Sequence, residues 1–421
     1  MINRPEYLDA LKRHKDKSDL MKVITGVRRC GKSTILILFQ DYLLKTGISG
    51  DQIISINLES KEYADFRNGD VLYKYVKEQT KSNKQYYVFL DELQLVSDYE
   101  DIANSLRLRK NIDLYLTGST SYILTGKSKK NDAQGTATRW GGRYVEIKMF
   151  PLSFKEFSTS FTGSNIHKDE LYRFYVEQSS FPQVLDYYEK NTGSRYDKQA
   201  IQDYLAALYN TILVDDIMTQ EGVKDVNLLK RVINFLFANI GSPSSVNRIV
   251  GTINNDLKLL KSESKVYAAL IENYLSALQK SFLFYSATGY SAKGREYLTS
   301  NAKYYAVDVG LRYHLLGGDA SVDAGHILEN VVYLELLRRG YQVKIGSSDN
   351  KEVDFEATKP GGIKEYYQVS QSVMDENTAR REFSALQDIK DNHPKVVLTR
   401  DYGNTNQEGI WHKNVLEWLL G

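Results

Sequence analysis

A short stretch at positions 26–34 constrains the fold of this 421-residue chain more than any other part of its sequence. It reads Gly-Val-Arg-Arg-Cys-Gly-Lys-Ser-Thr and fits the pattern G-x-x-x-x-G-K-[ST], which forms loops around phosphate groups. A strand-like run, residues 22–25, precedes it, and apolar residues at helical spacing follow at 33–45. The alternative is a plain glycine turn at a helix start, but the strand before the motif and the helix after it favour a phosphate loop.

The residue types in this loop suit the binding of a nucleoside triphosphate. Its two glycines let the backbone turn its amides toward the β-phosphate, and the start of the helix adds partial positive charge. Lys32 is expected to bridge the β- and γ-phosphates, and Ser33 to bind Mg²⁺. We therefore predict ATP and Mg²⁺ as cofactors, with a nucleotide site made of Gly26, Val27, Arg28, Arg29, Cys30, Gly31, Lys32, Ser33 and Thr34.

An apolar run at residues 86–90 ends in two carboxylates, Asp91 and Glu92. We predict that Asp91 helps to hold Mg²⁺ and that Glu92 polarises the attacking water. The alternative is that the two carboxylates only mark the solvated end of a strand, since an apolar strand often ends in Asp-Glu. Here, however, the phosphate loop lies upstream at the spacing expected for a second magnesium-side motif.

Two further positions are predicted to complete the reaction site. Ser119 follows the strand-like run at 112–116 and would orient the γ-phosphate or the water, with Thr117 as second choice and a plain turn as the alternative. Arg143 stands before the last expected strand, where ring-forming ATPases commonly project an arginine into a neighbouring subunit's site. Arg139 lies close enough to compete for that role. We thus predict catalytic roles for Lys32, Glu92, Ser119 and Arg143.

The first third of the chain alternates short strand-like runs with helical stretches, the order that builds a parallel sheet covered by helices. Expected strands cover residues 22–25, 53–57, 86–90, 112–116 and 144–147, and expected helices cover 33–45, 69–80 and 98–110. We therefore predict an α/β fold, with a P-loop domain in residues 1–150.

The remaining residues are predicted to form three more domains. Residues 151–222 are helical in pattern and are interpreted as a lid or linker. Residues 223–318 give three helices and a strand pair, the order of a winged helix-turn-helix. Residues 319–421 form a separate α/β unit, with a helix at 327–339 and strands at 342–345, 352–357, 365–370 and 395–399.

Composition excludes several classes of protein. Lys and Arg total 55 against 53 for Asp and Glu, so the net charge of +2 gives no whole-chain argument for binding nucleic acid. The only cysteine, Cys30, excludes an intramolecular disulfide and a cysteine-cluster zinc site. A single cysteine suits a reducing compartment, so we expect a cytoplasmic protein. No apolar run approaches the roughly 18 residues of a membrane span. A redox role for Cys30 in the loop is a weaker alternative to an ordinary variable position.

Eight ordered blocks of sequence together resemble one known family: residues 25–34, 89–94, 116–119, 142–146, 151–157, 180–182, 303–311 and 352–355. The chain is similar, over nearly all its length, to the bacterial and archaeal AAA-like ATPases that carry a C-terminal domain of unknown function. The resemblance implies an AAA-type module, a winged helix and a C-terminal unit like the PD-(D/E)XK nuclease fold. Ser119 stands where that family usually has a phosphate-sensing asparagine.

A working nuclease of that fold needs a helix Glu, a strand Asp and then Glu-x-Lys on the adjacent strand. The resemblance places Glu329 and Asp354 at the first two positions, as a vestigial metal site. The third element reads Gln-Val-Ser at 368–370, so a charged ligand and the lysine are both missing. We predict a fold retained for binding or assembly, without DNA cleavage, unless a lysine such as Lys344 or Lys351 takes the missing role.

Three functions remain open for the whole chain. The leading one is an ATPase that acts on DNA or a protein partner through its C-terminal half, as a homo-oligomer if Arg143 acts on a neighbour. The second is a nucleotide-gated regulator with slow turnover, and the third is an ATP-dependent nuclease. DNA would be contacted by the helix at 265–280, with Lys293 and Arg295 touching phosphate, and protein docking by the same unit is the equal alternative.

Overall fold

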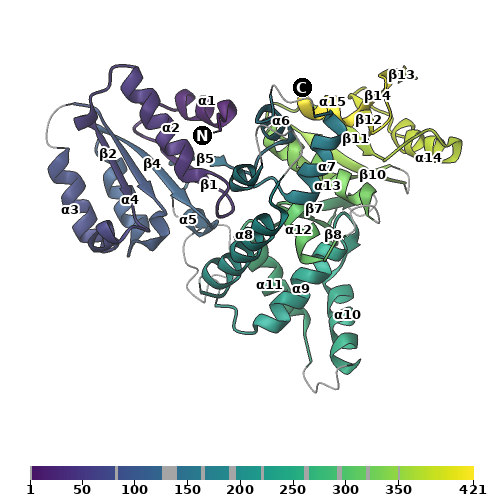
Figure 1. The fold of residues 1–421 in the computed structure, drawn as a ribbon, viewed down its shortest axis with the longest axis horizontal. Coiled ribbons are helices and arrows are strands. Elements are labelled where there is room, and N and C mark those ends of the chain that lie inside the picture. Colours follow the sequence, from purple (N-terminus) through teal and green to yellow (C-terminus); the bar gives the residue numbers. More distant parts are fainter. Residues whose placement is uncertain are drawn as a thin grey trace. The chain divides into compact units, whose positions relative to one another are not determined.

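The computed structural model describes residues 2–80, 84–125, 140–162, 166–188, 196–219, 222–259, 265–291, 296–318, 323–348 and 351–421. The chain divides into two compact units (Figure 1). The first holds residues 1–150 and 280–282, and the second holds 151–279 and 283–421.

The first unit is built on a five-stranded sheet in the order β2-β3-β4-β1-β5, with every neighbouring pair parallel. The five strands expected from the sequence are confirmed. One short 3-10 helix, Gly50–Gln52, precedes β2, and two others, Lys61–Arg67 and Leu93–Leu95, follow β2 and β3. The strands are β1 Met21–Thr25, β2 Ile53–Asn57, β3 Tyr86–Asp91, β4 Ile112–Gly118 and β5 Tyr144–Lys148, and the helices are α1 Pro5–Arg13, α2 Lys32–Lys45, α3 Gly69–Gln79, α4 Tyr99–Arg107 and α5 Tyr122–Thr125.

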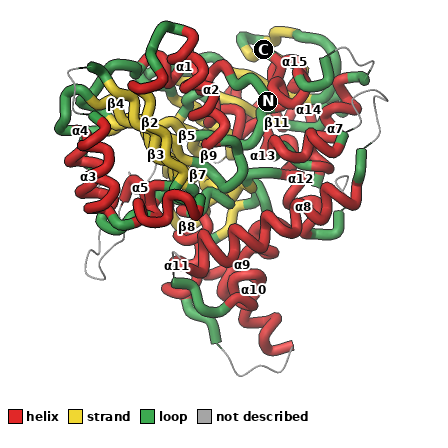
Figure 2. The backbone as a smooth tube through the Cα atoms, turned by 60° about the vertical axis from the view of Figure 1, so that its left-hand side comes forward, coloured by secondary structure: helices red, strands yellow, loops and turns green. Residues whose placement is uncertain are grey.

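Helices cover both faces of this sheet (Figure 2). Alternate residues of β3 face opposite sides, so Val88 joins the core formed with α3 and α4. Phe89 instead meets Phe39 of α2, with ring centroids 6.3 Å apart. Strands β1, β3 and β4 are buried on both faces, and β3 is a continuous apolar run up to Asp91. Lys22 interrupts the apolar residues of β1 and Asp113 those of β4, and these two buried side chains form an ion pair.

The first part of the second unit is helical. The described residues between 151 and 219 form helices joined by loops, as expected from the sequence, with a single isolated bridge between Tyr188 and Tyr196. Three further helices follow between residues 226 and 280. The helices are α6 Phe154–Thr159, α7 Lys168–Gln178, a 3-10 helix Pro182–Tyr187, α8 Lys198–Thr211, a π-helix Ile212–Thr219, α9 Val226–Ala238, α10 Val246–Leu259 and α11 Ala268–Lys280.

The rest of the second unit is built on a nine-stranded sheet in the order β13-β14-β12-β11-β10-β9-β7-β8-β6. Three helices pack against its strands and a fourth packs against α7: α13 Ala324–Arg338, α14 Glu376–Gln387 and α15 Val415–Leu420, and then α12 Val309–Leu315. The strands are β6 Pro243–Ser244, β7 Phe284–Ser291, β8 Glu296–Ala306, β9 Gln342–Ser348, β10 Lys351–Thr358, β11 Lys364–Val369, β12 Lys395–Thr399, β13 Thr405–Gln407 and β14 Ile410–Asn414.

The hairpin β7–β8 shares this sheet with the C-terminal strands, because β7 pairs in parallel with β9 through Gly289 and Ile345. The order of α9, α10, α11 and a hairpin is the one expected for a winged helix. The assignment as a winged helix, and the domain limits at residues 222 and 318, stay predictions. Lys293 and Arg295 lie outside the described residues. Among the helices that the structure describes, none has the length and apolar character needed to cross a membrane.

Candidate phosphate-binding site

The predicted phosphate loop runs from the carboxyl end of β1 to the first residue of α2. Three of its residues have positive φ: Gly26 at 150°, Arg29 at 66° and Gly31 at 108°. A Cβ atom on Gly26 would lie only 2.0 Å from the carbonyl oxygen of Met149, directly after β5. Glycine is therefore required at position 26 both by the backbone conformation and by the close passage of the β5 end.

We expect Gly26→Ala to destabilise the first unit by about 2 kcal/mol, since an atom forced into such a contact must displace backbone. Thermal or denaturant unfolding measures this loss. Gly50→Ala is the matched control, because a Cβ atom there meets nothing within 4 Å. Equal stability of the two variants would contradict the close packing of the loop against residue 149.

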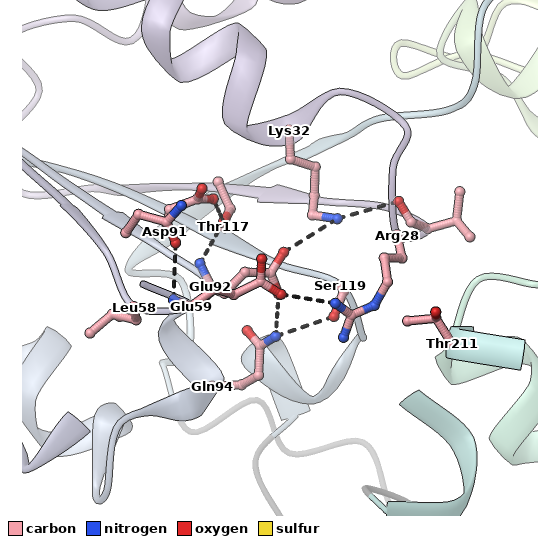
Figure 3. Close-up of polar contacts among 12 residues, drawn as sticks. Arg28, Lys32, Leu58, Glu59, Asp91, Glu92, Gln94, Thr117, Ser119 and Thr211 are labelled. Carbon is pink, nitrogen blue, oxygen red and sulfur yellow. Dashed lines mark hydrogen bonds and ion pairs between the residues drawn. The ribbon is translucent and has the colours of Figure 1, made fainter. Parts of the chain in front are cut away.

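The ammonium group of Lys32 lies at the centre of the loop and is almost fully buried (Figure 3). It donates to the carbonyl oxygens of Gly26 at 3.0 Å and Val27 at 3.3 Å. It also lies 3.7 Å from a carboxylate oxygen of Glu92. All three partners are oxygen atoms. Phosphate oxygens of a bound nucleotide could therefore take their place around the ammonium group.

Asp91, the last residue of β3, is held by two hydroxyl groups. The Thr117 hydroxyl at the end of β4 donates to the Asp91 carboxylate and accepts the Glu92 N–H at 2.9 Å. The Ser33 hydroxyl also hydrogen-bonds to that carboxylate. Burial raises the pKa of Asp91, and the two hydroxyl groups oppose this shift by stabilising the charged form.

Glu92 follows directly and adopts a left-handed backbone conformation, with φ 56° and ψ 50°. This conformation is strained for a residue other than glycine and is often found at functional sites. One carboxylate oxygen faces Lys32, and the other accepts from the Gln94 amide, which also donates to the Ser119 hydroxyl at 3.2 Å. Burial opposes the charge, but Lys32 and Gln94 hold the pKa of Glu92 below its ordinary value, so the carboxylate is ionised.

The sheet order explains how these residues meet. Strand β4 lies between β1 and β3, so its carboxyl end brings Thr117 and Ser119 between the phosphate loop and the Asp91-Glu92 pair. The sequence placed Ser119 beside this pair and kept Thr117 as second choice. In the structure Thr117 touches Asp91 directly, whereas Ser119 reaches Glu92 together with Gln94.

Other loop residues fix the loop itself. Arg28 pairs with Glu59 at 2.8 Å, and buried Arg4 donates to the carbonyl oxygen of Cys30 at 2.8 Å. Val27 is buried, whereas Arg29 is exposed and Thr34 is half-buried. Burial raises the pKa of the Cys30 thiol. A raised pKa does not favour the thiolate, so this geometry gives no support to a redox role for Cys30.

Arg143 lies apart from this cluster. It is exposed and directly precedes β5, and its carbonyl oxygen accepts the N–H of Met21 at the start of β1. The loop leaves the opposite end of β1, after Thr25, so Arg143 lies at the far edge of its own sheet. Arg139 lies outside the described residues.

Two residues of this site, Gln94 and Arg4, are not predicted from the sequence. Gln94 stands two positions after Glu92, and this proximity was the available signal. Arg4 reaches the loop from 26 residues upstream, and nothing local to it indicated that contact.

In the second unit, Glu329 lies on α13 and Asp354 on β10, and their assignment as a vestigial metal site stays a prediction. Both lie against Lys303 of β8, a residue that was not predicted for this place. Lys344 and Lys351, which the sequence analysis had considered, are on β9 and β10.

Comparison with known proteins supports the reading of the first unit. A family model described as an AAA domain matches residues 18–158, and one described as a domain of unknown function (DUF8612) matches residues 169–322. An uncharacterised protein of Haemophilus influenzae is 38% identical over 424 residues, covering 100% of this chain and 99% of that protein. An uncharacterised protein of Methanocaldococcus jannaschii is 27% identical, covering 91% of this chain and 83% of that protein.

Three solved structures match the chain with low TM-scores. The Aeropyrum pernix ORC1 protein in complex with DNA is 12% identical, with a TM-score of 0.35, over 75% of this chain and 93% of that chain. The Aeropyrum pernix ORC2 protein is 12% identical, with a TM-score of 0.38, over 79% and 93%. AMPPCP-bound DnaA from Aquifex aeolicus is 14% identical, with a TM-score of 0.30, over 66% and 92%. Scores this low carry no argument about function.

Family membership therefore rests on the sequence matches and on the observed sheet. The AAA model covers the residues that form the parallel sheet, the phosphate loop and the Asp91-Glu92 pair. The Haemophilus influenzae relative matches the chain from end to end. The chain belongs to the AAA-domain family of P-loop nucleotide-binding proteins.

Proposed function

We propose that the first unit binds ATP and hydrolyses it at the phosphate loop. The observation that carries this proposal is the convergence of the Lys32 ammonium group with the carboxylates of Asp91 and Glu92 at the carboxyl ends of β1, β3 and β4. Phosphoryl transfer to water requires a cation that binds phosphate, a carboxylate that helps to hold the metal ion and an ionised carboxylate that acts on the water. Lys32, Asp91 and Glu92 have these properties.

Ser33 and Asp91 fit a divalent cation. They already hydrogen-bond to each other, and their hydroxyl and carboxylate oxygens are ligands that Mg²⁺ prefers. When bound, Mg²⁺ would neutralise charge on the β- and γ-phosphates. Thr117 fixes the orientation of the Asp91 carboxylate.

The other residues then have separate roles. Lys32 exchanges the Gly26 and Val27 carbonyl oxygens for phosphate oxygens, a change that keeps its charge paired. Glu92 orients the attacking water and accepts its proton. Gln94 and Ser119 hold Glu92 in place, so Ser119 acts on the water through the glutamate side chain.

One observation favours the second candidate function, a nucleotide-gated regulator with slow turnover. Lys32 and Gln94 both contact Glu92 and, against the effect of burial, hold its pKa below the ordinary value, so the carboxylate is a weak base in this arrangement. Departure of Lys32 toward phosphate would release one side of the carboxylate. Nucleotide binding would then itself prepare the catalytic base.

We further propose that the nucleotide state is coupled to DNA or to a protein partner through the C-terminal half. The test measures binding of a labelled DNA duplex by the full chain with Mg²⁺-ATP, with Mg²⁺-ADP and without nucleotide. A nucleotide-dependent change in affinity supports DNA as the partner. If the chain does not bind DNA, or binds it equally in all three states, the result argues against DNA as the partner. The ATP-bound Glu92→Gln protein would then be used to isolate a protein partner.

Arg143 gives a prediction about assembly. Because it lies at the far edge of its own sheet, we propose that any catalytic role is exerted on a neighbouring copy. Arg143→Ala should then bind ATP normally but hydrolyse it on the order of 1,000-fold more slowly, as expected for loss of an arginine finger. Mixing it with Lys32→Ala protein should restore hydrolysis, since the mixed interfaces combine an intact loop with an intact arginine.

Arg13→Ala, at an exposed position on α1, is the control and should retain full activity. Absence of rescue in mixed oligomers, shown to form by size and mass, would contradict action on a neighbour.

A further inference from the structure

The nuclease-like centre of the second unit contains a buried lysine. The ammonium group of Lys303 lies 2.9 Å from Glu329 and 2.7 Å from Glu352, and 3.7 Å from Asp354. Its side chain is only 4% exposed. Lys303 comes from β8, whereas Glu329 belongs to α13 and the other two carboxylates to β10. The cation therefore lies among the carboxylates that the nuclease fold would use for a metal ion.

Glu329, which is buried, and Asp354, which is half-buried, have further partners. The Tyr305 hydroxyl donates to the same Glu329 oxygen at 2.7 Å, and His326 lies 3.6 Å from the other oxygen. The second oxygen of Asp354 accepts the Val369 N–H at 2.8 Å. Few lone pairs are left for a divalent cation, which needs several oxygens at about 2.0–2.6 Å.

Gln368, at the third position of the nuclease pattern, hydrogen-bonds to two neighbouring groups. The Gln368 side chain accepts the Asp354 N–H at 3.2 Å and donates to Glu382 of α14 at 2.7 Å. A carboxylate at position 368 would place another negative charge beside Glu382, whereas the amide satisfies both neighbours. Within the part of the chain that the structure describes, no group of three or more His, Cys, Asp or Glu residues is arranged to hold a metal ion.

We propose that Lys303 permanently takes the place of the divalent cation, so that the former metal centre is a metal-independent ionic joint. An ammonium group in van der Waals and hydrogen-bond contact with these carboxylates supplies positive charge without an open coordination position. The joint connects the β7–β8 hairpin to α13 and β10. Tyr305 reinforces it, because its ring stacks on Tyr333 of α13 with centroids 4.0 Å apart.

A competing role for Lys303 is that of a relocated catalytic lysine, which would steady an attacking water beside a bound metal ion. That role requires a metal ion at Glu329 and Asp354 together with Lys303. In the ionic joint, by contrast, a metal ion cannot bind at Glu329 and Asp354 while the Lys303 ammonium group is there. Metal binding by matched variants distinguishes the two.

The experiment titrates the nucleotide-free full chain with Mn²⁺ and counts bound ions by electron paramagnetic resonance. Wild type should show no Mn²⁺-binding site that depends on Asp354 at concentrations up to about 1 mM, where even weak protein sites are occupied. Lys303→Met should gain one site, and Lys303→Met with Asp354→Asn should lose it again. Lys364→Met is the matched control, because Lys364 pairs with Glu356 at 3.0 Å on neighbouring strands of the same sheet, and it should gain no site.

A folded Lys303→Met protein that gains no Mn²⁺ site would overturn the proposal. If that variant fails to fold, wild type and Asp354→Asn still decide the matter. An Mn²⁺ site in wild type that Asp354→Asn removes would overturn it, as would metal-dependent nicking of supercoiled DNA that the same substitution abolishes. Identical Mn²⁺ titrations of the two proteins, with no nicking, would support it.

Discussion

Replacement of Lys32 by alanine should remove measurable ATP binding, with a loss of affinity of at least about 100-fold. The lysine supplies a buried ammonium group at the loop centre, and truncating one partner of a buried charge pair costs about 2–5 kcal/mol. Arg28 pairs with Glu59, Arg4 holds the Cys30 carbonyl oxygen, and Arg29 is exposed, so none of the three occupies the buried position of Lys32. Titration with a fluorescent ATP analogue measures the effect.

The matched control is Lys45→Ala, which removes an exposed lysine at the opposite end of the same helix. It should bind ATP like wild type. Circular dichroism and thermal unfolding establish that Lys32→Ala is folded. Unchanged affinity in a folded Lys32→Ala protein would exclude the loop as the phosphate site.

Glu92→Gln should keep ATP binding and lose hydrolysis by about 100- to 10,000-fold, the usual contribution of a general base. The amide preserves the shape of the side chain and can still pair with its neighbours, but it cannot accept a proton from water. Comparing ATP affinity with the rate of phosphate release separates the two effects.

Glu62→Gln, at an exposed position in the same unit, serves as the control and should hydrolyse ATP at the wild-type rate. If Glu92→Gln and wild type hydrolyse ATP equally fast, Glu92 is not the base. A parallel loss of binding would instead show that the glutamate is needed to organise Lys32.

The sequence predicted the first unit well because its signals are local. Strand β3 is a continuous apolar run up to Asp91, and the loop motif lies between the short strand β1 and a helix. Thr117 and Ser119 could be placed beside Asp91 because parallel strands end at the same edge of the sheet. The αL conformation of Glu92 has no such signature, since glutamate rarely adopts it.

The second unit was harder to predict. Strand β13 is three exposed polar residues, Thr-Asn-Gln, which lack the alternation that marks a strand. The parallel pairing of β7 with β9 joins segments more than 50 residues apart, which no local pattern specifies. Helices α12, α14 and α15 were not predicted. The contact of Lys303 with Glu329 spans 26 residues, so only the three-dimensional fold showed that a lysine takes the expected place of a metal ion.

The central claim is that the phosphate loop supports repeated ATP hydrolysis by the ionised carboxylate of Glu92. It is tested most directly by measuring phosphate release from a large excess of Mg²⁺-ATP over wild-type protein, with Glu92→Gln measured in parallel. We predict linear release well beyond one phosphate per chain for wild type and almost none for the variant. Release that stops at one phosphate per chain, or that continues equally in Glu92→Gln, would contradict the claim.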